Sequence, residues 1–386
     1  MILRRRRSRT LVPFILGALL GLAIIAAVSY YSLGFSLDLG LGLSPTPTAI
    51  PSPTPVRAEP YVEEARRLEA EGRLDDAISQ YELAIAAEPS YVDAYVGWAR
   101  ILAHRRNPAE AVKKAMRAVE LAPTSAEAYS TLAVAHDWNN EPDPAIAAAR
   151  KAIELNPNLA EAHAYLAEAY TDKHRLGEAS ESLARALSLN PKSVAAVRVK
   201  GYFHEAQAQY AEAATEYARA IELAPKQPYL YLLLGNVLKA IGDFQGAILR
   251  YQQAADLDPR DPRAAAGIGS SYYALAEHQK AEEHLKAALA LDPDYATALG
   301  QLAAVYYSQK RYADAIPYFL RAIELEKSPA TSASYRHVLG WSLYAEKRYA
   351  EAREQFAKAL ELDPKLQGAR DGLEMVKKAE SEGGSR

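Results

Sequence analysis

Apolar and small residues recur along this chain with a period of 34 residues, from Ala58 almost to the C-terminus. The clearest copy is Pro228–Asp261, which reads PYLYLLLGNVLKAIGDFQGAILRYQQAADLDPRD. In each half of this copy the apolar residues are spaced three or four apart, which is typical of a helix with one buried face. Gly242 and Asp243 interrupt the pattern, and Pro259 ends it. The copy therefore predicts a helix–turn–helix hairpin.

The same frame fits nine consecutive copies, and each residue can be given a position from 1 to 34 within its copy. Positions 20 and 27 are alanine in every copy, and position 8 is always alanine or glycine. Such small side chains let two helices approach closely while bulky residues fill the space beside them. A three-residue insertion precedes the last copy. The copies are 58–91, 92–125, 126–159, 160–193, 194–227, 228–261, 262–295, 296–329 and 333–366.

This pattern resembles the tetratricopeptide repeat, with small residues at positions 8, 20 and 27, an aromatic residue at 24 and proline at 32. The resemblance implies an all-α, right-handed solenoid of about nine helix hairpins. The first helix of each hairpin would line a concave groove. We expect a solvating helix over 367–380, which caps the array, and a disordered tail over 381–386.

Two copies depart from the pattern. In the third copy, Pro142 and Pro144 replace the usual glycine turn, and we expect the second helix to start only at about Pro144. In the fifth copy, Lys200 and His204 occupy positions that are normally apolar. We therefore expect the interface of the fifth copy to be the weakest in the array.

The N-terminal segment predicts a membrane anchor. Residues 1–10 contain five arginines, and 11–35 carry no charge and are mostly apolar. A helix of 18 residues is about 27 Å long, close to the roughly 30 Å hydrocarbon core of a bilayer. The arginines should keep 1–10 in the cytoplasm and place the repeats outside it. The alternative is a cleaved signal peptide, but this apolar stretch is longer than the usual 7–15 residues.

Two further features belong to the N-terminal part. Gly17 and Gly21 form a G-x-x-x-G pair, a pattern that promotes dimers of membrane helices, although glycine is also common in such helices without that role. The linker 36–57 contains a stretch rich in Pro, Ser and Thr. Frequent proline favours an extended polyproline II spacer between the membrane and the repeats.

Charge and motif content exclude several classes of function. Residues 58–386 hold 39 of the 45 Lys and Arg and 47 of the 48 Asp and Glu, a net charge of −8. This balance argues against nucleic acid, whose phosphates require a basic face. The chain has no cysteine, and its eight histidines show no metal-binding spacing. We predict neither catalysis, nor a cofactor, nor a metal site.

In the tetratricopeptide family, positions 2, 5, 9, 12 and 13 face the groove. In the first four copies these positions are mostly acidic: Glu59, Asp93, Glu127, Asp137, Glu161, Glu168 and Asp172, with Arg66, Arg100 and His104 among them. In the later copies they are aromatic with scattered polar groups: Tyr202, Tyr229, Asn236, Lys239, Arg263, Tyr273, Tyr307, His337, Trp341 and Tyr344. Aromatic side chains and arginines dominate binding hot spots, so we predict a peptide or protein ligand on this second set. The alternative is that the tyrosines only pack against the next repeat.

The sequence thus predicts a non-enzymatic adaptor or scaffold, anchored in the cell membrane and exposed outside the cytoplasm. Envelope assembly and secretion are the settings in which similar anchored repeat proteins work. Two alternatives stay open at this point. One is an accessory subunit that binds substrate for a separate membrane enzyme. The other is an oligomeric structural element built through Gly17 and Gly21 or through the ends of the array.

Overall fold

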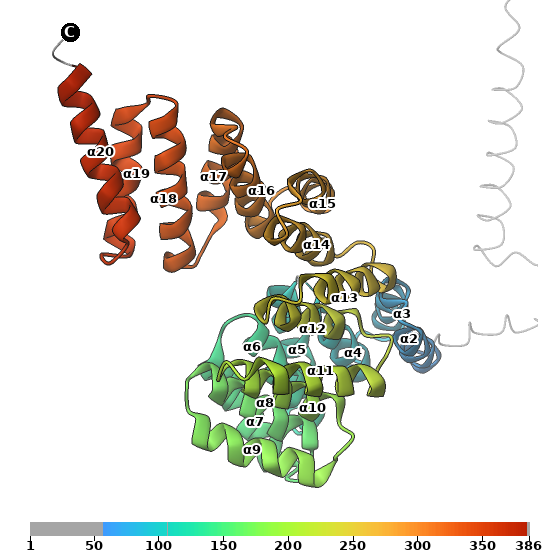
Figure 1. Ribbon diagram of the computed structural model, residues 1–386. Helices are drawn as coiled ribbons and strands as arrows, with labels where there is room; N and C mark the ends of the chain where they lie inside the picture. The colour runs from blue at the N-terminus through green and yellow to red at the C-terminus, as the bar shows by residue number, and fades with distance from the viewer. Residues whose placement is uncertain (1–56, 106, 384–386) are drawn as a thin grey trace, which may run out of the picture. The chain divides into compact units, whose positions relative to one another are not determined.

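The computed structural model describes residues 57–105 and 107–383, and within them every regular element is a helix (Figure 1). The predictions made for residues 1–56, including the membrane helix 11–35, the Gly17/Gly21 pair and most of the linker, lie outside the described residues. The helices are α2 (Glu59–Glu71), α3 (Leu74–Ala87), α4 (Val92–His104), α5 (Pro108–Leu121), α6 (Ala126–Trp138), α7 (Pro142–Leu155), α8 (Ala160–Asp172), α9 (Leu176–Leu189), α10 (Val194–Glu205), α11 (Tyr210–Leu223), α12 (Pro228–Ala240), α13 (Phe244–Leu257), α14 (Pro262–Ala274), α15 (His278–Leu291), α16 (Ala296–Ser308), α17 (Tyr312–Leu325), α18 (Pro329–Ala345), α19 (Tyr349–Leu362) and α20 (Gln367–Gly383).

The predicted fold class is confirmed as an all-helical repeat solenoid. Each of the nine sequence copies holds two helices, and α20 packs against α19 and α18 at the C-terminal end. The alanines at positions 20 and 27 are at most 1% exposed in all nine copies, because they lie where neighbouring helices touch. Among the described residues, no helix is both long and apolar enough to cross a membrane.

The large residue at position 24 explains why glycine or alanine is needed beside it. The Tyr251 ring lies between Gly235 of its own copy and Gly267 of the next. A Cβ added at Gly235 would come within 2.7 Å of that ring, and one at Gly267 within 2.6 Å. Real Cβ atoms do not approach so closely, so these two glycines are required by packing. The same ring thus joins one hairpin to the next.

In the eight hairpins whose position 15 is among the described residues, the turn places that position in the left-handed region. The position is glycine at Gly72 and Gly242, which adopt positive φ without strain. Six other copies place a residue with a side chain there, and each still has φ between 57° and 61°. These six residues are Asn140, His174, Ala208, Ala276, Lys310 and Lys347.

Three details differ from what the sequence predicted or add to it. Helix α7 begins at Pro142, not at about Pro144, because prolines are tolerated in a first turn, where the backbone N–H groups have no partner in the helix. Helix α20 continues to Gly383, so 381–383 are helical and not part of a disordered tail. The three-residue insertion lengthens α18 to 17 residues, adding about one turn at its start.

The left-handed turn residues give a first prediction. Replacing Ala276 with glycine should stabilise the protein by about 1 kcal/mol, because an L-residue pays about 1–2 kcal/mol in this conformation and glycine does not. The measurement is the free energy of unfolding in urea, followed by circular dichroism. The same exchange at exposed Ala287, inside α15, is the matched control and should destabilise by about 1 kcal/mol. Equal effects at the two sites would show that the left-handed conformation of Ala276 carries no strain.

Candidate functional site

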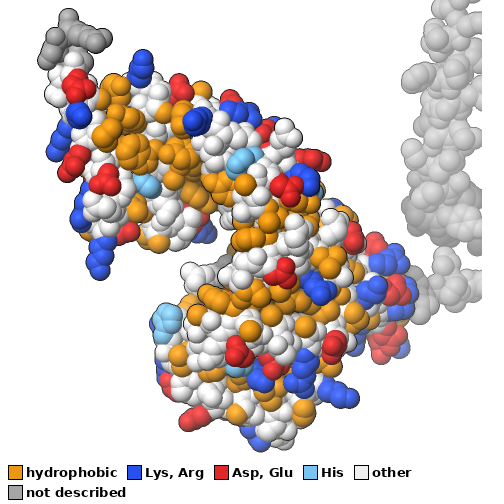
Figure 2. Space-filling view, viewed as in Figure 1, with side chains coloured by type: hydrophobic (Ala, Val, Ile, Leu, Met, Phe, Trp, Pro, Cys, Tyr) orange, Lys and Arg blue, Asp and Glu red, His pale blue; other side chains and the backbone are white. Residues whose placement is uncertain are grey.

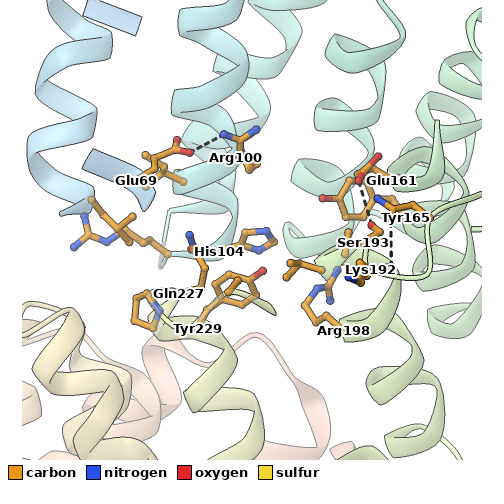
Figure 3. A pocket seen from close by; sticks show the side chains of 18 of the residues that line it. Glu69, Arg100, His104, Glu161, Tyr165, Lys192, Ser193, Arg198, Gln227 and Tyr229 are labelled. Carbon is orange, nitrogen blue, oxygen red and sulfur yellow. Dashed lines mark hydrogen bonds and ion pairs between the residues drawn. The ribbon is translucent and has the colours of Figure 1, made fainter. Parts of the chain in front are cut away.

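A cavity of about 370 Å³ is lined mainly by the first helices α2, α4, α8, α10 and α12 and by the loops beside them (Figure 3). We call it the inner cavity and define it by Arg100, His104, Tyr165, Arg198 and Tyr229, which come from α4, α8, α10 and α12. Its walls mix aromatic rings with charged side chains. A space of this size, with a few convergent polar groups, is typical of a binding site.

One wall of the inner cavity is held by a buried ion pair. Both outer nitrogens of Arg198 donate to the two carboxylate oxygens of Glu168 at 2.5 Å. Arg198 is 2% exposed and Glu168 is 4% exposed. Glu168 was expected on an open acidic groove, so the structure corrects that expectation. Removing one partner of such a pair leaves an uncompensated buried charge, which destabilises proteins by about 3–5 kcal/mol.

Asp137 is also buried, although it too was expected on an open surface. One of its carboxylate oxygens has no hydrogen-bond partner. Burial raises the pKa of Asp137 well above its ordinary value, and the negative charges of Glu168 and Asp172 raise it further. Nearby, the Tyr202 hydroxyl donates to Asp172, so this predicted groove tyrosine is occupied by an internal bond. Of the acidic residues predicted to face the groove in the early copies, Asp137 and Glu168 are therefore desolvated. Three others are exposed: Glu59, Asp93 and Glu127.

Tyr229 closes the lower side of the inner cavity. It is 7% exposed, and its ring stacks on His104 with 4.1 Å between the ring centres. Trp138 meets both rings edge-on. Burial holds the pKa of His104 well below its ordinary value, so its ring is neutral at pH 7. Tyr229 was predicted on an accessible groove surface, and the structure instead makes it part of an aromatic cluster between α4 and α12.

Four of the predicted residues do come together in a second, smaller pocket of about 150 Å³. These are Tyr229, Asn236, Lys239 and Arg263, and we call this space the junction pocket. Asn236 accepts a hydrogen bond from the Tyr251 hydroxyl. The pocket shares Tyr229 and Arg263 with the inner cavity, so the two spaces adjoin.

Lys239 is the one ammonium group among the residues that line the junction pocket, and no carboxylate lines it. The Lys239 Nζ atom donates to the Ser270 hydroxyl at 3.1 Å. Burial lowers the pKa of Lys239, because the charged form loses water. The side-chain oxygen of Gln301, on the same pocket, is buried without a partner. The pocket is thus cationic and has unused polar groups.

Beyond the junction pocket, three tyrosines at position 12 repeat along the C-terminal copies. Tyr273, Tyr307 and Tyr344 each contact the ring at position 17 of their own copy, with ring centres 5.8, 5.6 and 5.4 Å apart. Tyr273 is 37% exposed, and the other two are half-buried. Figure 2 shows hydrophobic side chains gathered over α18 and α19. These tyrosines remain candidates for contact with a partner.

His337 and Trp341 are less available than the sequence suggested. The Trp341 indole N–H donates to His337 Nε2 at 3.0 Å, and its ring meets Phe356 with 5.3 Å between centres. Burial lowers the pKa of His337. Both side chains pack between α18 and α19. They therefore support the packing of these helices, as the packing alternative for the aromatic residues proposed.

Sequence reasoning missed two residues of the inner cavity. Arg198 lies at position 5 of its copy, one of the groove-facing positions, so the same rule that selected Tyr202 could have found it. Tyr165 lies one residue outside that rule, at position 6, and no signal in the sequence separated it from a core tyrosine. Among 57–105 and 107–383, no group of His, Asp and Glu is arranged to hold a metal ion.

Family comparisons agree with this geometry. Models described as tetratricopeptide repeat match 261–328 and 294–365, 62–126 and 172–228, and 126–159, and one described as TPR repeat matches 235–275. The chain is built of tetratricopeptide repeats. No curated protein sequence matches it significantly.

Two solved structures are similar to this chain. The first is the crystal structure of the APC/C hetero-tetramer Cut9–Hcn1, with a TM-score of 0.66, 18% identity and 79% of this chain covered. This chain spans only 59% of the length of that one. The second is PilF of Pseudomonas aeruginosa, with a TM-score of 0.44, 21% identity, 55% of this chain and 96% of that chain covered. At such identity the first likeness shows the fold alone.

The contrast between Trp341 and Tyr273 gives a second prediction. Trp341→Ala should destabilise the protein by about 2–4 kcal/mol, because it removes a packed indole and leaves a cavity beside Phe356. Tyr273→Ala should cost less than about 1 kcal/mol, since that ring is largely at the surface. Chemical unfolding of both variants measures the difference. Similar losses would mean that Trp341 does not support the stack.

A third prediction concerns the buried carboxyl of Asp137. Its pKa is raised in the folded state, so folding favours the protonated form. The part of the unfolding free energy that comes from protonated Asp137 is fully present at low pH. It is lost as pH rises from about 4 through the raised pKa of Asp137. Asp137→Asn should remove this loss, and the gain in unfolding free energy over the wild type should therefore grow with pH. Urea unfolding at a series of pH values is the measurement. A gain that stays constant with pH would contradict the prediction.

Proposed function

We propose that this protein is a non-enzymatic scaffold that binds a partner protein or peptide on the concave side of its C-terminal repeats. Tetratricopeptide-repeat proteins typically mediate protein–protein interactions, and this fold covers nearly all of 58–383. The observation that carries the proposal is the junction pocket, which is lined by residues of α14 and α16, the helices that also carry Tyr273 and Tyr307. It combines aromatic surface with unused polar groups, the usual composition of an interaction hot spot.

The groove used by the partner is limited to the later copies. Several groove-facing side chains of the first six copies make internal contacts, as Tyr229 and Tyr202 do, whereas Asn236 and Lys239 of the sixth copy line the junction pocket. In the last three copies the position-12 tyrosines have one face against their own hairpin and remain partly exposed. The partner segment therefore runs from Lys239 along Tyr273 and Tyr307.

The partner places an acidic group beside Lys239. This ammonium is half-buried, and its recorded bond is to the neutral hydroxyl of Ser270. A desolvated charge without a counter-ion is unfavourable, and an incoming carboxylate would compensate it. Arg263 lies on the same pocket, but its guanidinium is already paired with Asp261 at 2.6 Å.

We also propose that the scaffold works at a membrane. The support is the sequence of 1–35, in which an arginine-rich stub precedes an uncharged apolar stretch. In this arrangement the stub is cytoplasmic and the repeats are extracytoplasmic, where they take part in envelope assembly or secretion. The absence of catalysis belongs to the same proposal, since the repeats leave no second domain within 58–383 for an active site.

Site-specific crosslinking in cells tests the binding surface. A photoreactive residue at Tyr307 should capture a protein that one at Leu320 does not, because Leu320 is an exposed side chain on the second helix of the same copy. Mass spectrometry identifies the product. A single dominant partner supports a dedicated adaptor, and a captured membrane enzyme would favour the accessory-subunit alternative. A product containing only this chain would favour the oligomeric alternative, and equal capture at both sites would contradict the groove.

A fourth prediction concerns Lys239 and the partner identified in this way. Lys239→Ala should weaken binding by about 10–100-fold, since a hydrogen bond to a charged group contributes about 1.5–3 kcal/mol. The unfolding free energy should not fall, because the lysine has no anionic partner to lose. Lys310→Ala, at an exposed lysine in a turn, is the control and should leave affinity unchanged. Titration calorimetry measures both.

A further inference from the structure

A set of charged residues joins the beginning of the array to its sixth copy. Arg105, at the end of α4, donates from Nε and Nη2 to the two oxygens of Asp258, at 2.7 and 2.6 Å. Its other terminal nitrogen donates to Asp75 at 2.6 Å, and Asp75 also pairs with Arg260. We call Asp75, Arg105, Asp258 and Arg260 the seam. It bridges residues more than 150 positions apart in sequence.

Comparison with equivalent positions shows that the seam is additional to ordinary repeat packing. Asp75 and Arg105 occupy positions 18 and 14 of adjacent copies, and Asp143 and Lys173 form the same neighbour pair two copies later. Arg105 differs from Lys173 because it also reaches Asp258. The contact between Arg105 and Asp75 thus has an equivalent in another pair of neighbouring copies. The contact between Arg105 and Asp258 is additional to it.

Asp258 makes a different hydrogen-bond contact from the residues at the same position of other copies. In four other copies the Asp or Asn at position 31 accepts a hydrogen bond from the backbone N–H two residues later, which fixes the loop between hairpins. Asp258 instead accepts from Arg105 with both oxygens and is 3% exposed. Its geometry is that of a bidentate arginine–carboxylate pair, the strongest kind of ion pair at such a site.

The seam reaches the inner cavity through one of its four residues. Arg105 lines that cavity, and Arg263, just after the seam, donates to the backbone oxygen of His104 at 2.7 Å. The stacked pair His104 and Tyr229 crosses the same boundary. Copies one to six are joined in sequence by their hairpin contacts, so the seam completes a closed ring around the cavity. In Figure 1, α3 and α4 lie beside α13.

The seam differs physically from the interfaces between consecutive copies. Consecutive copies share clusters of buried apolar side chains, such as the one that joins Tyr231 to Ile268. Among the described residues, no apolar cluster joins α3 or α4 to α13, although Trp138 of α6 packs against the cluster that holds Tyr229 and Leu230. Opening the seam therefore separates the ion pairs, the hydrogen bond from Arg263 to His104 and the ring contacts of Tyr229, but no apolar cluster that joins α3 or α4 to α13. Ion pairs that can regain water on separation hold weakly compared with an apolar core.

We propose that the seam is a gate on the inner cavity, closed by Arg105 and Asp258 and able to open while every hairpin stays folded. While the ring is closed, a chain reaches the cavity only by threading a free end along its axis. When the gate opens, an internal segment of a partner can enter from the side. The proposal rests on the proposed function for what enters, but the gate itself is testable without any partner.

The first experiment measures the distance across the seam in the full chain, reconstituted in nanodiscs. The chain has no cysteine, so Glu82→Cys and Gln252→Cys, both on exposed helix faces of α3 and α13, give a single pair of spin labels. We expect one short, narrow distance distribution in the otherwise unchanged protein. Arg105→Ala and Asp258→Asn should each add a population at longer distance, with unchanged helix content by circular dichroism. Lys173→Ala removes the matched neighbour pair and should leave the distribution narrow.

The second experiment measures access to the cavity. A single cysteine at Gln227, which lines the inner cavity, is treated with a maleimide attached to a bulky polymer. Its reaction should be about tenfold faster with Arg105→Ala than with Lys173→Ala. Conversely, Gly72→Cys with Lys226→Cys, whose Cβ atoms would lie 3.3 Å apart, should form a disulfide that closes the seam. In that oxidised variant Arg105→Ala should no longer lengthen the distance.

The outcomes separate the gate from the proposed function. An unchanged distance distribution in both seam variants, together with an unchanged labelling rate at Gln227, would overturn the gate and leave the C-terminal groove as it stands. Opening of the ring by Lys173→Ala as well would also overturn it, because ordinary repeat contacts would then control closure. Opening confined to the Arg105 and Asp258 variants would support the gate even if crosslinking at Tyr307 captured nothing.

Discussion

Close contact between helices at the alanine and glycine positions is the constraint on which the rest of this structure depends. Each hairpin has small residues where its two helices touch, and in seven of the nine copies a large side chain at position 24 fills the space that they leave. Tyr251 shows how strict this is, since the glycines on either side of it have no room for a methyl group. The contact between small residues repeats in every copy, so one local geometry is propagated along the array.

Because one geometry is repeated along the array, copies that are far apart in sequence come into contact, and no single repeat determines this contact. Successive hairpins turn far enough that the sixth copy meets the second, and equivalent groove positions then meet different surroundings. Tyr229 stacks on His104 of a distant copy, whereas Tyr307 contacts only its own hairpin and a neighbour. The early copies thus acquire an interior, and the late copies keep an open concave face.

This difference marks how far the sequence could predict the structure. The period of 34 and the small residues predicted the helices, and Ala77 and Ala111 are buried as expected. Contacts such as that between Arg105 and Asp258 could not be predicted, because closure depends on a small rotation summed over several hairpins. Selection by groove-facing position therefore found Lys239 and Arg263, which share the junction pocket. The same selection also found Trp341, whose ring packs against Phe356. Local pattern identifies which way a side chain faces but not what lies opposite.

The charges inside the ring follow from the same geometry. A solenoid copy normally keeps groove-facing Asp, Glu and Arg in water, but Glu168, Asp137 and Arg198 are buried here. Glu168 and Arg198 compensate each other's charge, and burial raises the pKa of Asp137, which favours its neutral form. Apolar residues at these positions would have packed the ring permanently shut. Paired and hydratable groups instead allow the interior to be exposed again at modest free-energy cost, which is what a cavity with an openable wall requires.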